Sequence, residues 1–132
     1  MLIVVLFITS VSVKDEFDIT AKPTYIRDGD TFEVSDNVIR LADVSCPETY
    51  EVGGYDSTQA LRYLIWDRTV YINIDDVYQT GPYGRLICLV YVSWNSTHYL
   101  NVNLALVLMG RATITNYDNE WNPRTWTLYV SK

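Results

Sequence analysis

The sequence is poor in the residues on which many catalytic and metal-binding sites depend. Its 132 residues include one histidine and two cysteines. A single histidine, His98, supports neither a Ser-His-Asp nor a Cys-His arrangement, and we expect it on the surface or in a strand. The two cysteines lack the spacing of a zinc site, and no GxxxxGK[ST] loop is present. These absences exclude the common nucleophile–histidine, structural-zinc and P-loop chemistries.

Basic charge is also scarce. Ten Lys and Arg residues stand against sixteen Asp and Glu residues, which gives a net charge of −6 and a sequence pI of about 4.5. A non-specific DNA coat protein would be broadly basic, so that class is disfavoured. A few arginines in one groove, together with a bound divalent cation, would still hold a phosphodiester. Binding to long nucleic acid is then expected to be weak and strongly salt-sensitive.

Residues 1–13, MLIVVLFITSVSV, form an uncharged apolar run that is too short to span a bilayer comfortably. Its length is that of a signal-peptide core, although no basic residue precedes Lys14. We expect an export signal or a short membrane anchor, and hence a secreted or cell-surface protein. The alternative is an extra N-terminal strand in a cytoplasmic protein. Residues 14–132 then form a single domain with one hydrophobic core.

The two cysteines, Cys46 and Cys88, allow one internal pairing at most. Two free thiols, with Cys88 buried in a strand, are the favoured interpretation. A disulfide between them is the alternative, and export would make it more plausible.

A hairpin at residues 31–41 organises the rest of the chain. Thr31–Val34 and Val38–Leu41 show the alternation of half-buried strands, and residues 35–37 are turn formers. A hairpin brings its outer ends together. The charged residues at those ends are Asp28, Asp30, Arg40, Asp43 and Glu48. Carboxylates gathered beside a guanidinium indicate a site that a hard cation and a phosphate share.

The remaining elements follow from alternation and from helical periodicity. Further strands are predicted at 19–27, 69–75, 86–92, 112–115 and 126–130, with a brief pairing at 99–100. A first helix is predicted from Asp56, where Asp56–Gln59 has capping-box spacing, with Ala60, Leu61, Leu64 and Ile65 on its inner face. A second helix is predicted between Asn101 as its cap and Gly110 as its stop, with Val102, Ala105, Leu108 and Met109 facing inward.

Four sequence blocks carry a family resemblance. They are DGDTF at 28–32, RLADVSCPE at 40–48, YGR at 83–85 and LNVNLALVLMGRA at 100–112. Their order and approximate spacing resemble those of the thermonuclease (staphylococcal nuclease-like) family over roughly residues 18 to 117. The resemblance implies a mainly β, α+β fold with two helices, a five-stranded Greek-key OB-fold barrel. The pattern of short strands with an interposed and a capping helix suggests the same barrel.

The resemblance also assigns roles to single residues. Glu48 matches the family's catalytic base, and Arg40 matches the arginine that binds the phosphate. Arg85 matches the second arginine, which contacts the phosphate and assists the leaving group. Tyr83 matches a ring that packs near the nucleotide. Arginine suits both cationic positions, because its planar fork matches phosphate oxygens and it stays charged.

The metal site departs from the family pattern. There, two aspartates and a backbone carbonyl bind calcium. Asp30 matches the first aspartate and Cys46 the carbonyl position, but Ser45 stands in place of the second aspartate. Either Asp43 replaces that ligand, or Asp30, Glu48 and the substrate phosphate hold a partly hydrated ion. Calcium is the expected cofactor, with magnesium or manganese as alternatives. Asp28 and Thr31 are expected to support the ligands from behind.

The C-terminal tail is rich in aromatic rings: Tyr117, Trp121, Trp126 and Tyr129. The favoured interpretation is that these rings cover a barrel face. The alternative is a stacking platform for bases, with Tyr117 as a substrate contact. Family members usually carry a third helix here, which this sequence does not predict.

The sequence therefore predicts a metal-dependent nuclease that cleaves DNA and RNA with little sequence preference, as a monomer without a stable protein partner. The rival is a non-catalytic OB-fold module that binds single-stranded nucleic acid or a protein partner.

Overall fold

The computed structural model describes residues 17–132. The apolar segment 1–13, and with it the expected export signal, lies outside the described residues. None of the helices within 17–132 has the length and apolar character needed to cross a bilayer.

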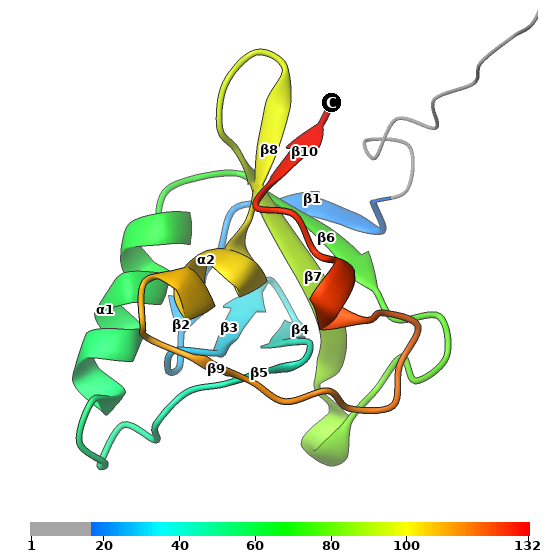
Figure 1. Cartoon of the computed structure of the whole chain (residues 1–132). Coiled ribbons are helices and arrows are strands. Elements are labelled where there is room, and N and C mark those ends of the chain that lie inside the picture. The colour runs from blue at the N-terminus through cyan, green and yellow to red at the C-terminus, as the bar shows by residue number, and fades with distance from the viewer. Residues whose placement is uncertain (1–16) are drawn as a thin grey trace, which may run out of the picture.

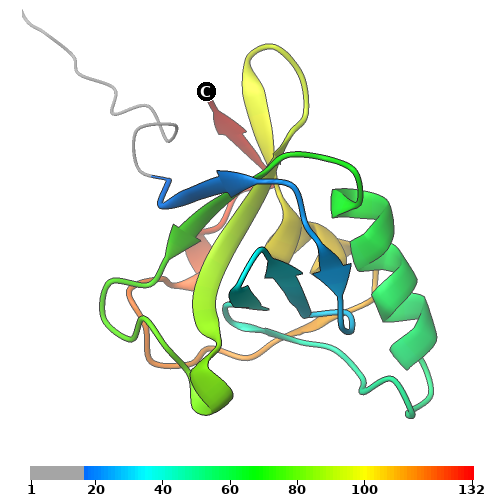
Figure 2. The ribbon, with the colours of Figure 1, turned by 180° about the vertical axis from the view of Figure 1, so that it is seen from behind.

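A strongly curled sheet forms the body of the molecule, and two helices pack together at one end of it (Figures 1 and 2). The order along the sheet is β1-β6-β7-β4-β3-β2, and β8 joins β7 to β10. The strands of this sheet are β1 (Ile19–Ala21), β2 (Tyr25–Ile26), β3 (Thr31–Val34), β4 (Asn37–Leu41), β6 (Val70–Ile74), β7 (Leu86–Ser93), β8 (His98–Asn101) and β10 (Tyr129–Ser131). The fold is mainly β with two helices, and the predicted OB-type α+β class is confirmed.

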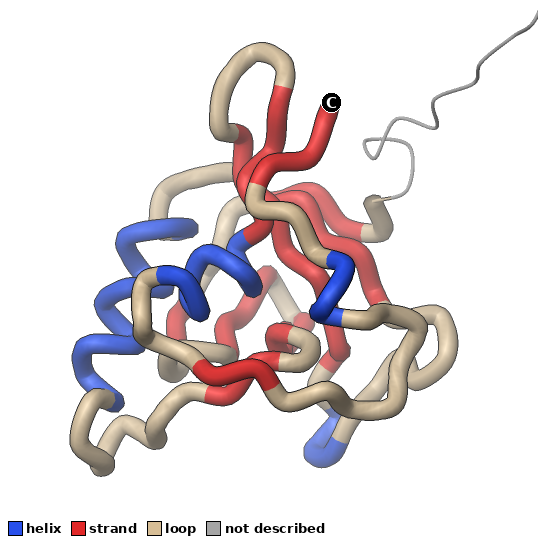
Figure 3. The backbone as a smooth tube through the Cα atoms, viewed as in Figure 1, coloured by secondary structure: helices blue, strands red, loops and turns tan. Residues whose placement is uncertain are grey.

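A second, two-stranded ribbon lies apart from the main sheet, as the red segments of Figure 3 show. It pairs β5 (Val44–Ser45) with β9 (Thr113–Ile114). The predicted last strand at 112–115 therefore exists, but its partner is the segment that follows the hairpin.

The predicted hairpin is confirmed, but Asn37, predicted as part of the turn, is the first residue of β4. β3 and β4 pair antiparallel from Thr31↔Arg40 to Val34↔Asn37, which leaves Ser35 and Asp36 as a two-residue turn. Ser35 has a φ of 52°, in the left-handed region that such tight turns require. The register places Arg40 directly opposite Thr31, next to Asp30.

The long first strand predicted at 19–27 is wrong, because it is two strands. β1 pairs with β6 and β2 pairs with β3, and the chain crosses between them at Lys22–Thr24. Pro23, which has no N–H to give to a ladder, sits in that break. The chain can thus change partner strands and close the curl.

One parallel pairing brings the two halves of the barrel together. Residues 39–41 of β4 lie beside 86–88 of β7, with Arg40 opposite Ile87. The buried side chain of Asn103 fastens the junction: its Oδ1 accepts from Val90 N, and its Nδ2 donates to the carbonyls of Ala42 and Cys88. Because both the oxygen and the nitrogen of this amide are hydrogen-bonded, its burial is compensated, and its bonds fix the spacing of the two strands.

Helix α1 (Gly54–Ile65) buries the predicted face of Ala60, Leu61, Leu64 and Ile65. Its predicted start at Asp56 is wrong. The helix begins two residues earlier, behind Gly53, whose φ of 88° lets the chain turn sharply, and no side chain caps it.

Helix α2 (Val102–Leu108) has the predicted cap, because Asn101 accepts a hydrogen bond from Leu104 N. The expected inward positions of Leu108 and Met109 are wrong, since both side chains are exposed. Asn103 and Leu106 are buried in their place, because the buried face of the helix lies on residues 102, 103, 105 and 106.

The C-terminal segment runs back across the sheet. A short 3-10 turn at Pro123–Thr125 stands where the resembling family usually has a third helix. The predicted edge strand at 126–130 is shifted to β10, which pairs with β8. Trp121 and Trp126 pack against a cluster of Leu89, Tyr91 and Tyr99, so two of the four tail rings cover the sheet as favoured, whereas Tyr117 and Tyr129 remain exposed.

Candidate functional site

The outer ends of the hairpin converge on Asp30. This buried carboxylate accepts from Thr31 Oγ1 at 2.9 Å through Oδ1 and from Cys46 N at 3.0 Å through Oδ2. Asp28 supports it from behind, since its Oδ1 accepts from Asp30 N at 3.0 Å. The loop after β3–β4 is thereby pinned to the loop before it, as the sequence predicted.

Other negatively charged side chains lie near Asp28. Burial raises the pKa of its carboxyl to about 6, and the nearby charges of Asp30 and, to a smaller extent, Glu48 add to the rise. Glu48 therefore lies near enough for its charge to be felt by this pair. An acidic cluster with a raised pKa is an environment that a cation stabilises.

Among the described residues at the ends of the hairpin, Arg40 is the one cationic side chain beside the acidic residues. Its Nη1 donates to the carbonyls of Leu41 and Val44, at 2.5 and 2.7 Å, and its Nη2 lies 3.4 Å from Asp30 Oδ2. The guanidinium is thus held in a fixed plane at the end of β4. A fixed, charged donor of this kind suits a phosphate oxygen.

The loop that carries Glu48 is exposed and is held by hydrogen bonds between its own residues. Glu48 N donates to Glu51 Oε1, and Glu51 N donates back to the Glu48 carbonyl, both at 2.9 Å. Gly54 lies against that carbonyl: a Cβ at residue 54 would come within 1.9 Å of it. Glycine at this position is what lets α1 start directly under the Glu48 loop.

Arg85 comes immediately before the first residue of β7. Its carbonyl accepts from Gly81 N at 2.7 Å, which closes the preceding turn. In this turn Tyr83 has a φ of 66° and is 94% exposed, and its ring centroid is 5.6 Å from the Arg85 guanidinium carbon. A bulky residue in the left-handed region at a surface turn is typical of a binding position.

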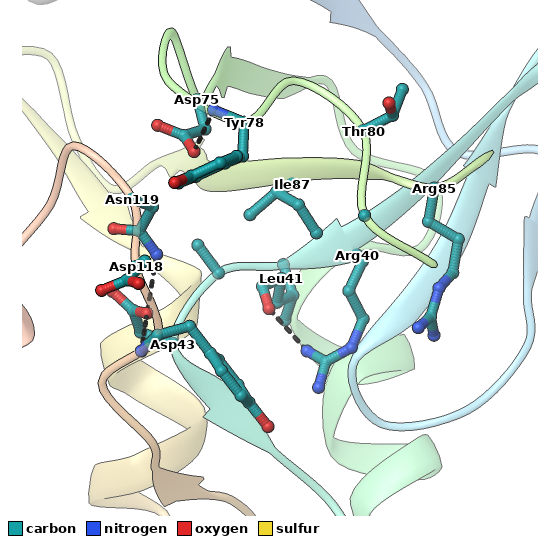
Figure 4. Close-up of a pocket in the computed structure, with 13 residues that line it drawn as sticks. Arg40, Leu41, Asp43, Asp75, Tyr78, Thr80, Arg85, Ile87, Asp118 and Asn119 are labelled. Atoms are coloured by element: carbon teal, nitrogen blue, oxygen red, sulfur yellow. Dashed lines mark hydrogen bonds between the residues drawn. The ribbon is translucent and has the colours of Figure 1, made fainter. Parts of the chain in front are cut away.

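Both arginines line one cavity of about 600 Å³ (Figure 4). Leu41 and Ile87 form its apolar part, while Tyr78 and Tyr117 add aromatic rings. Its volume lies in the range of small-ligand pockets. The family resemblance implied that Arg40 and Arg85 share a phosphate site, and the parallel pairing of β4 with β7 brings the two residues to one cavity.

A family model described as staphylococcal nuclease homologue matches residues 38–129. The chain belongs to this family. The match includes Arg40, Glu48 and Arg85 and begins after Asp28, Asp30 and Thr31. A search of curated proteins finds no significant match. The family supports a nuclease-like or nucleic acid-binding module of OB type.

In this staphylococcal nuclease homologue, the residue at the expected second metal-ligand position is Ser45, which has no carboxylate. Ser45 lies in β5 opposite Thr113, whose Oγ1 is 3.5 Å from the Ser45 carbonyl. Within residues 17–132, no group of three or more His, Cys, Asp or Glu side chains is placed to hold a metal ion. The described residues therefore do not form a cage of several carboxylates, and both oxygens of Asp30 already have partners within the chain.

Asp43 does not stand beside Asp30 as a replacement ligand. Its Oδ1 accepts from Tyr117 N at 2.9 Å and from Asn119 Nδ2 at 2.7 Å, so it holds the C-terminal segment. Burial raises its pKa, and these two hydrogen bonds work against the rise. The physical reason is the φ of 57° at Asp43, which turns the chain sharply between β4 and β5.

Sequence reasoning missed Asp75 as a member of this wall. Its Oδ1 accepts from Glu120 N at 3.0 Å, and its Oδ2 accepts from Tyr78 N at 2.9 Å. It joins the loop after β6 to the C-terminal segment. An aspartate at a strand end followed by a long loop was the only available signal, and that pattern is too common to single it out.

The cysteines are both free, as the favoured interpretation predicted. Burial raises the pKa of the Cys46 thiol to about 12 and raises that of Cys88 as well. Burial thus favours the protonated form of both thiols. Cys46 packs under Gly29, where a Cβ would come within 2.9 Å of its Sγ.

Proposed function

We propose that this staphylococcal nuclease homologue hydrolyses phosphodiester bonds of DNA and RNA with the help of a divalent cation. The observation that carries the proposal is the cavity that Arg40 and Arg85 share, together with the contact between Arg40 and Asp30. Two guanidinium groups on one cavity wall match the oxygens of a phosphodiester. The net charge of −6 disfavours binding along an extended stretch of nucleic acid. It is compatible with a local contact at one phosphate.

Each side chain has a defined task in this mechanism. Glu48, exposed on its loop, accepts the proton of the attacking water. Arg40 is fixed by two carbonyls, so it meets the charge that develops on the phosphate without having to reorganise. Arg85 holds a second oxygen and stabilises the leaving group.

The cation would be bound by Asp30 and the Cys46 carbonyl, with Asp28 and Thr31 supporting Asp30. Its chemistry would be to withdraw charge from the phosphate and from the attacking water. Calcium, magnesium and manganese are the candidates. We also propose that the protein acts as a monomer and is secreted or attached to the cell surface.

A second candidate is a binding module that no longer cleaves. Ser45 favours it, because the site has one carboxylate ligand where the family has two. Both oxygens of Asp30 are also already engaged within the chain. Such a module would bind single-stranded nucleic acid through the same cavity.

The deciding experiment is cleavage of single-stranded DNA with calcium, magnesium, manganese or EDTA, for the wild type and for Glu48→Gln. We expect metal-dependent cleavage that falls by about 10² to 10⁴ in Glu48→Gln. Glu51→Gln is the matched control, because it lies in the same loop and keeps an oxygen for Glu48 N. Cleavage that survives Glu48→Gln would remove Glu48 as the base. DNA binding without cleavage under every metal, by a folded protein, would establish the binding module instead.

A further inference from the structure

The loop between β7 and β8 carries a motif that phosphodiester cleavage does not use. Residues 95–97 read Asn-Ser-Thr, the acceptor triplet for attachment of a sugar to asparagine in exported proteins. The sequence has eight asparagines, and Asn95 alone is followed two positions later by Ser or Thr. Because a triplet of this kind also arises by chance, its place in the fold has to decide whether a glycan fits there.

The triplet lies at the end of a projecting hairpin (Figure 1). β7 ends at Ser93 and β8 begins at His98, and residues 94–97 between them are all exposed. The backbone of the loop is closed at its base, where Trp94 N and Asn95 N donate to the His98 carbonyl at 3.0 and 3.2 Å. A bulky group at this tip therefore extends into solvent and displaces no packed side chain.

Hydrogen bonds hold the side chain of Asn95 by its oxygen. Oδ1 accepts from Thr97 N at 2.9 Å, from Thr97 Oγ1 at 3.0 Å and from His98 N at 2.8 Å. None of these bonds uses Nδ2, the nitrogen to which a sugar is attached in an N-linked glycan. The hydroxyl that the triplet requires thus lies against the acceptor amide in the folded chain, and the folded loop does not need the amide nitrogen.

Exposed aromatic rings lie beside the tip. Trp94 is 56% exposed and Tyr129 of β10 is 44% exposed, and their ring centroids are 5.2 Å apart. Residues 94–97 contain no charged side chain, in a protein with a net charge of −6. The tip is therefore an uncharged, partly apolar end of an acidic molecule, where a glycan would add the solubility that the side chains do not supply.

Strand β7 separates this tip from the arginine-lined cavity. Ile87, the second residue of the strand, lines the cavity, whereas Ser93 at the other end leads into the loop. A strand advances by about 3.3 Å per residue, so these two positions are roughly 20 Å apart. A glycan at the tip therefore leaves the cavity open.

We propose that Asn95 is an N-glycosylation site, at which an oligosaccharyl transferase attaches a glycan when the chain is exported. In that step Asn95 Nδ2 forms a bond to the anomeric carbon of the sugar, and the bond from that carbon to the pyrophosphate of a lipid-linked donor breaks. The lipid pyrophosphate leaves, and Nδ2 loses one proton to a base of the transferase. The inference rests on the proposed export and is independent of phosphodiester cleavage.

The test is cell-free synthesis of the full chain in the presence of microsomes that contain the transferase. Chains that are protected from added protease have been translocated, and only these are scored. We expect the protected wild-type chain to migrate more slowly on a gel and to lose this shift after treatment with the amidase that releases N-linked glycans. That amidase converts a glycosylated asparagine into aspartate, so mass spectrometry then locates the new aspartate at residue 95.

Three variants separate the triplet from asparagine exposure alone. Thr97→Val keeps Asn95 but removes the hydroxyl, and it is expected to abolish the shift. Thr97→Ser keeps the hydroxyl and is expected to retain the shift. Asn116→Gln changes an exposed asparagine that is not part of a triplet, and it is also expected to retain the shift.

The outcomes separate this proposal from the proposed nuclease activity. A protected wild-type chain without an amidase-sensitive shift would overturn the glycan at Asn95, as would a shift that survives in Thr97→Val. Failure of the chain to enter the microsomes would overturn it too, because the modification requires export. The wild-type peptide map decides the question even if a variant misfolds. No nucleic acid enters these readouts, so a protein that fails to cleave DNA would leave the glycan proposal standing.

Discussion

Arg40 Nη2 lies 3.4 Å from Asp30 Oδ2, so that the phosphate-binding candidate and the metal-ligand candidate touch across the β3–β4 hairpin. The pair is mostly buried, with side-chain exposures of 14% and 10%. A cation bound at Asp30 would compete with Arg40 for the same oxygen, while the carbonyls of Leu41 and Val44 would keep the guanidinium in place.

Arg40 and Arg85 are expected to respond differently to the same substitution. Arg40→Lys cannot reach both carbonyls and Asp30 at once, so we expect a loss of about 1–3 kcal/mol of unfolding free energy together with reduced cleavage. Arg85→Lys is expected to reduce cleavage by a similar factor with little change in stability, because Arg85 is half-buried at the cavity. Urea unfolding and cleavage rates measured side by side test this contrast. Unchanged cleavage in Arg40→Lys would contradict the phosphate role.

Ser45→Asp restores the carboxylate that the resembling family has at this position. The new charge stands one residue before Cys46, whose N–H binds Asp30. We expect calcium to bind at least about tenfold more tightly, because a second anionic oxygen joins the first. Calcium titration by calorimetry measures the change. Ser96→Asp adds the same charge on the exposed loop between β7 and β8 and is the control. Equal affinities in the two variants would show that Ser45 does not face the cation.

Asp28 gives the protein a defined pH dependence. Its pKa of about 6 in the fold lies above the ordinary value of 3.8, so the folded state holds its proton more tightly than the unfolded state. The stabilisation is complete below pH 4 and is lost as pH rises through 6. Asp28→Asn keeps an oxygen for Asp30 N and removes this loss.

The variant should therefore match the wild type near pH 4 and exceed it by about 1 kcal/mol at pH 7, after solvent screening of a half-exposed group is discounted. Urea unfolding in the absence of metal, at pH 4 and at pH 7, measures the difference. A constant difference across this range would show that Asp28 does not titrate in the expected window.

The sequence was sufficient for the hairpin, for the inner face of α1 and for the meeting of Arg40 with Asp30. Each of these follows from a local signal: turn residues between alternating strands, apolar spacing, and charges at the ends of one hairpin. The start of α1 was missed because tertiary packing decided it. Gly54 is needed under the Glu48 carbonyl, and this close approach leaves no trace in helix propensity.

The role of Asp43 could not be predicted from its neighbours in the chain. Its partners, Tyr117 and Asn119, are supplied by the C-terminal segment, and only the fold brings them to β4. The same holds for Asp75 and Glu120. Charged residues near a metal motif are naturally assigned to the metal, whereas long-range hydrogen bonds to backbone groups have no sequence pattern of their own.

The parallel pairing of β4 with β7 also governs when the site comes into being. Residues 39–41 pair with residues 86–88, and α1 and β6 lie between these two segments in the chain. The entropy cost of closing this long loop is incurred before the pairing contacts form. We expect this loop closure to dominate the refolding time. Arg40 and Arg85 share a cavity only once it is complete, so a chain still emerging from the ribosome, or a fragment that ends before β7, carries Arg40 and Glu48 without the means to hold a phosphate between two arginines.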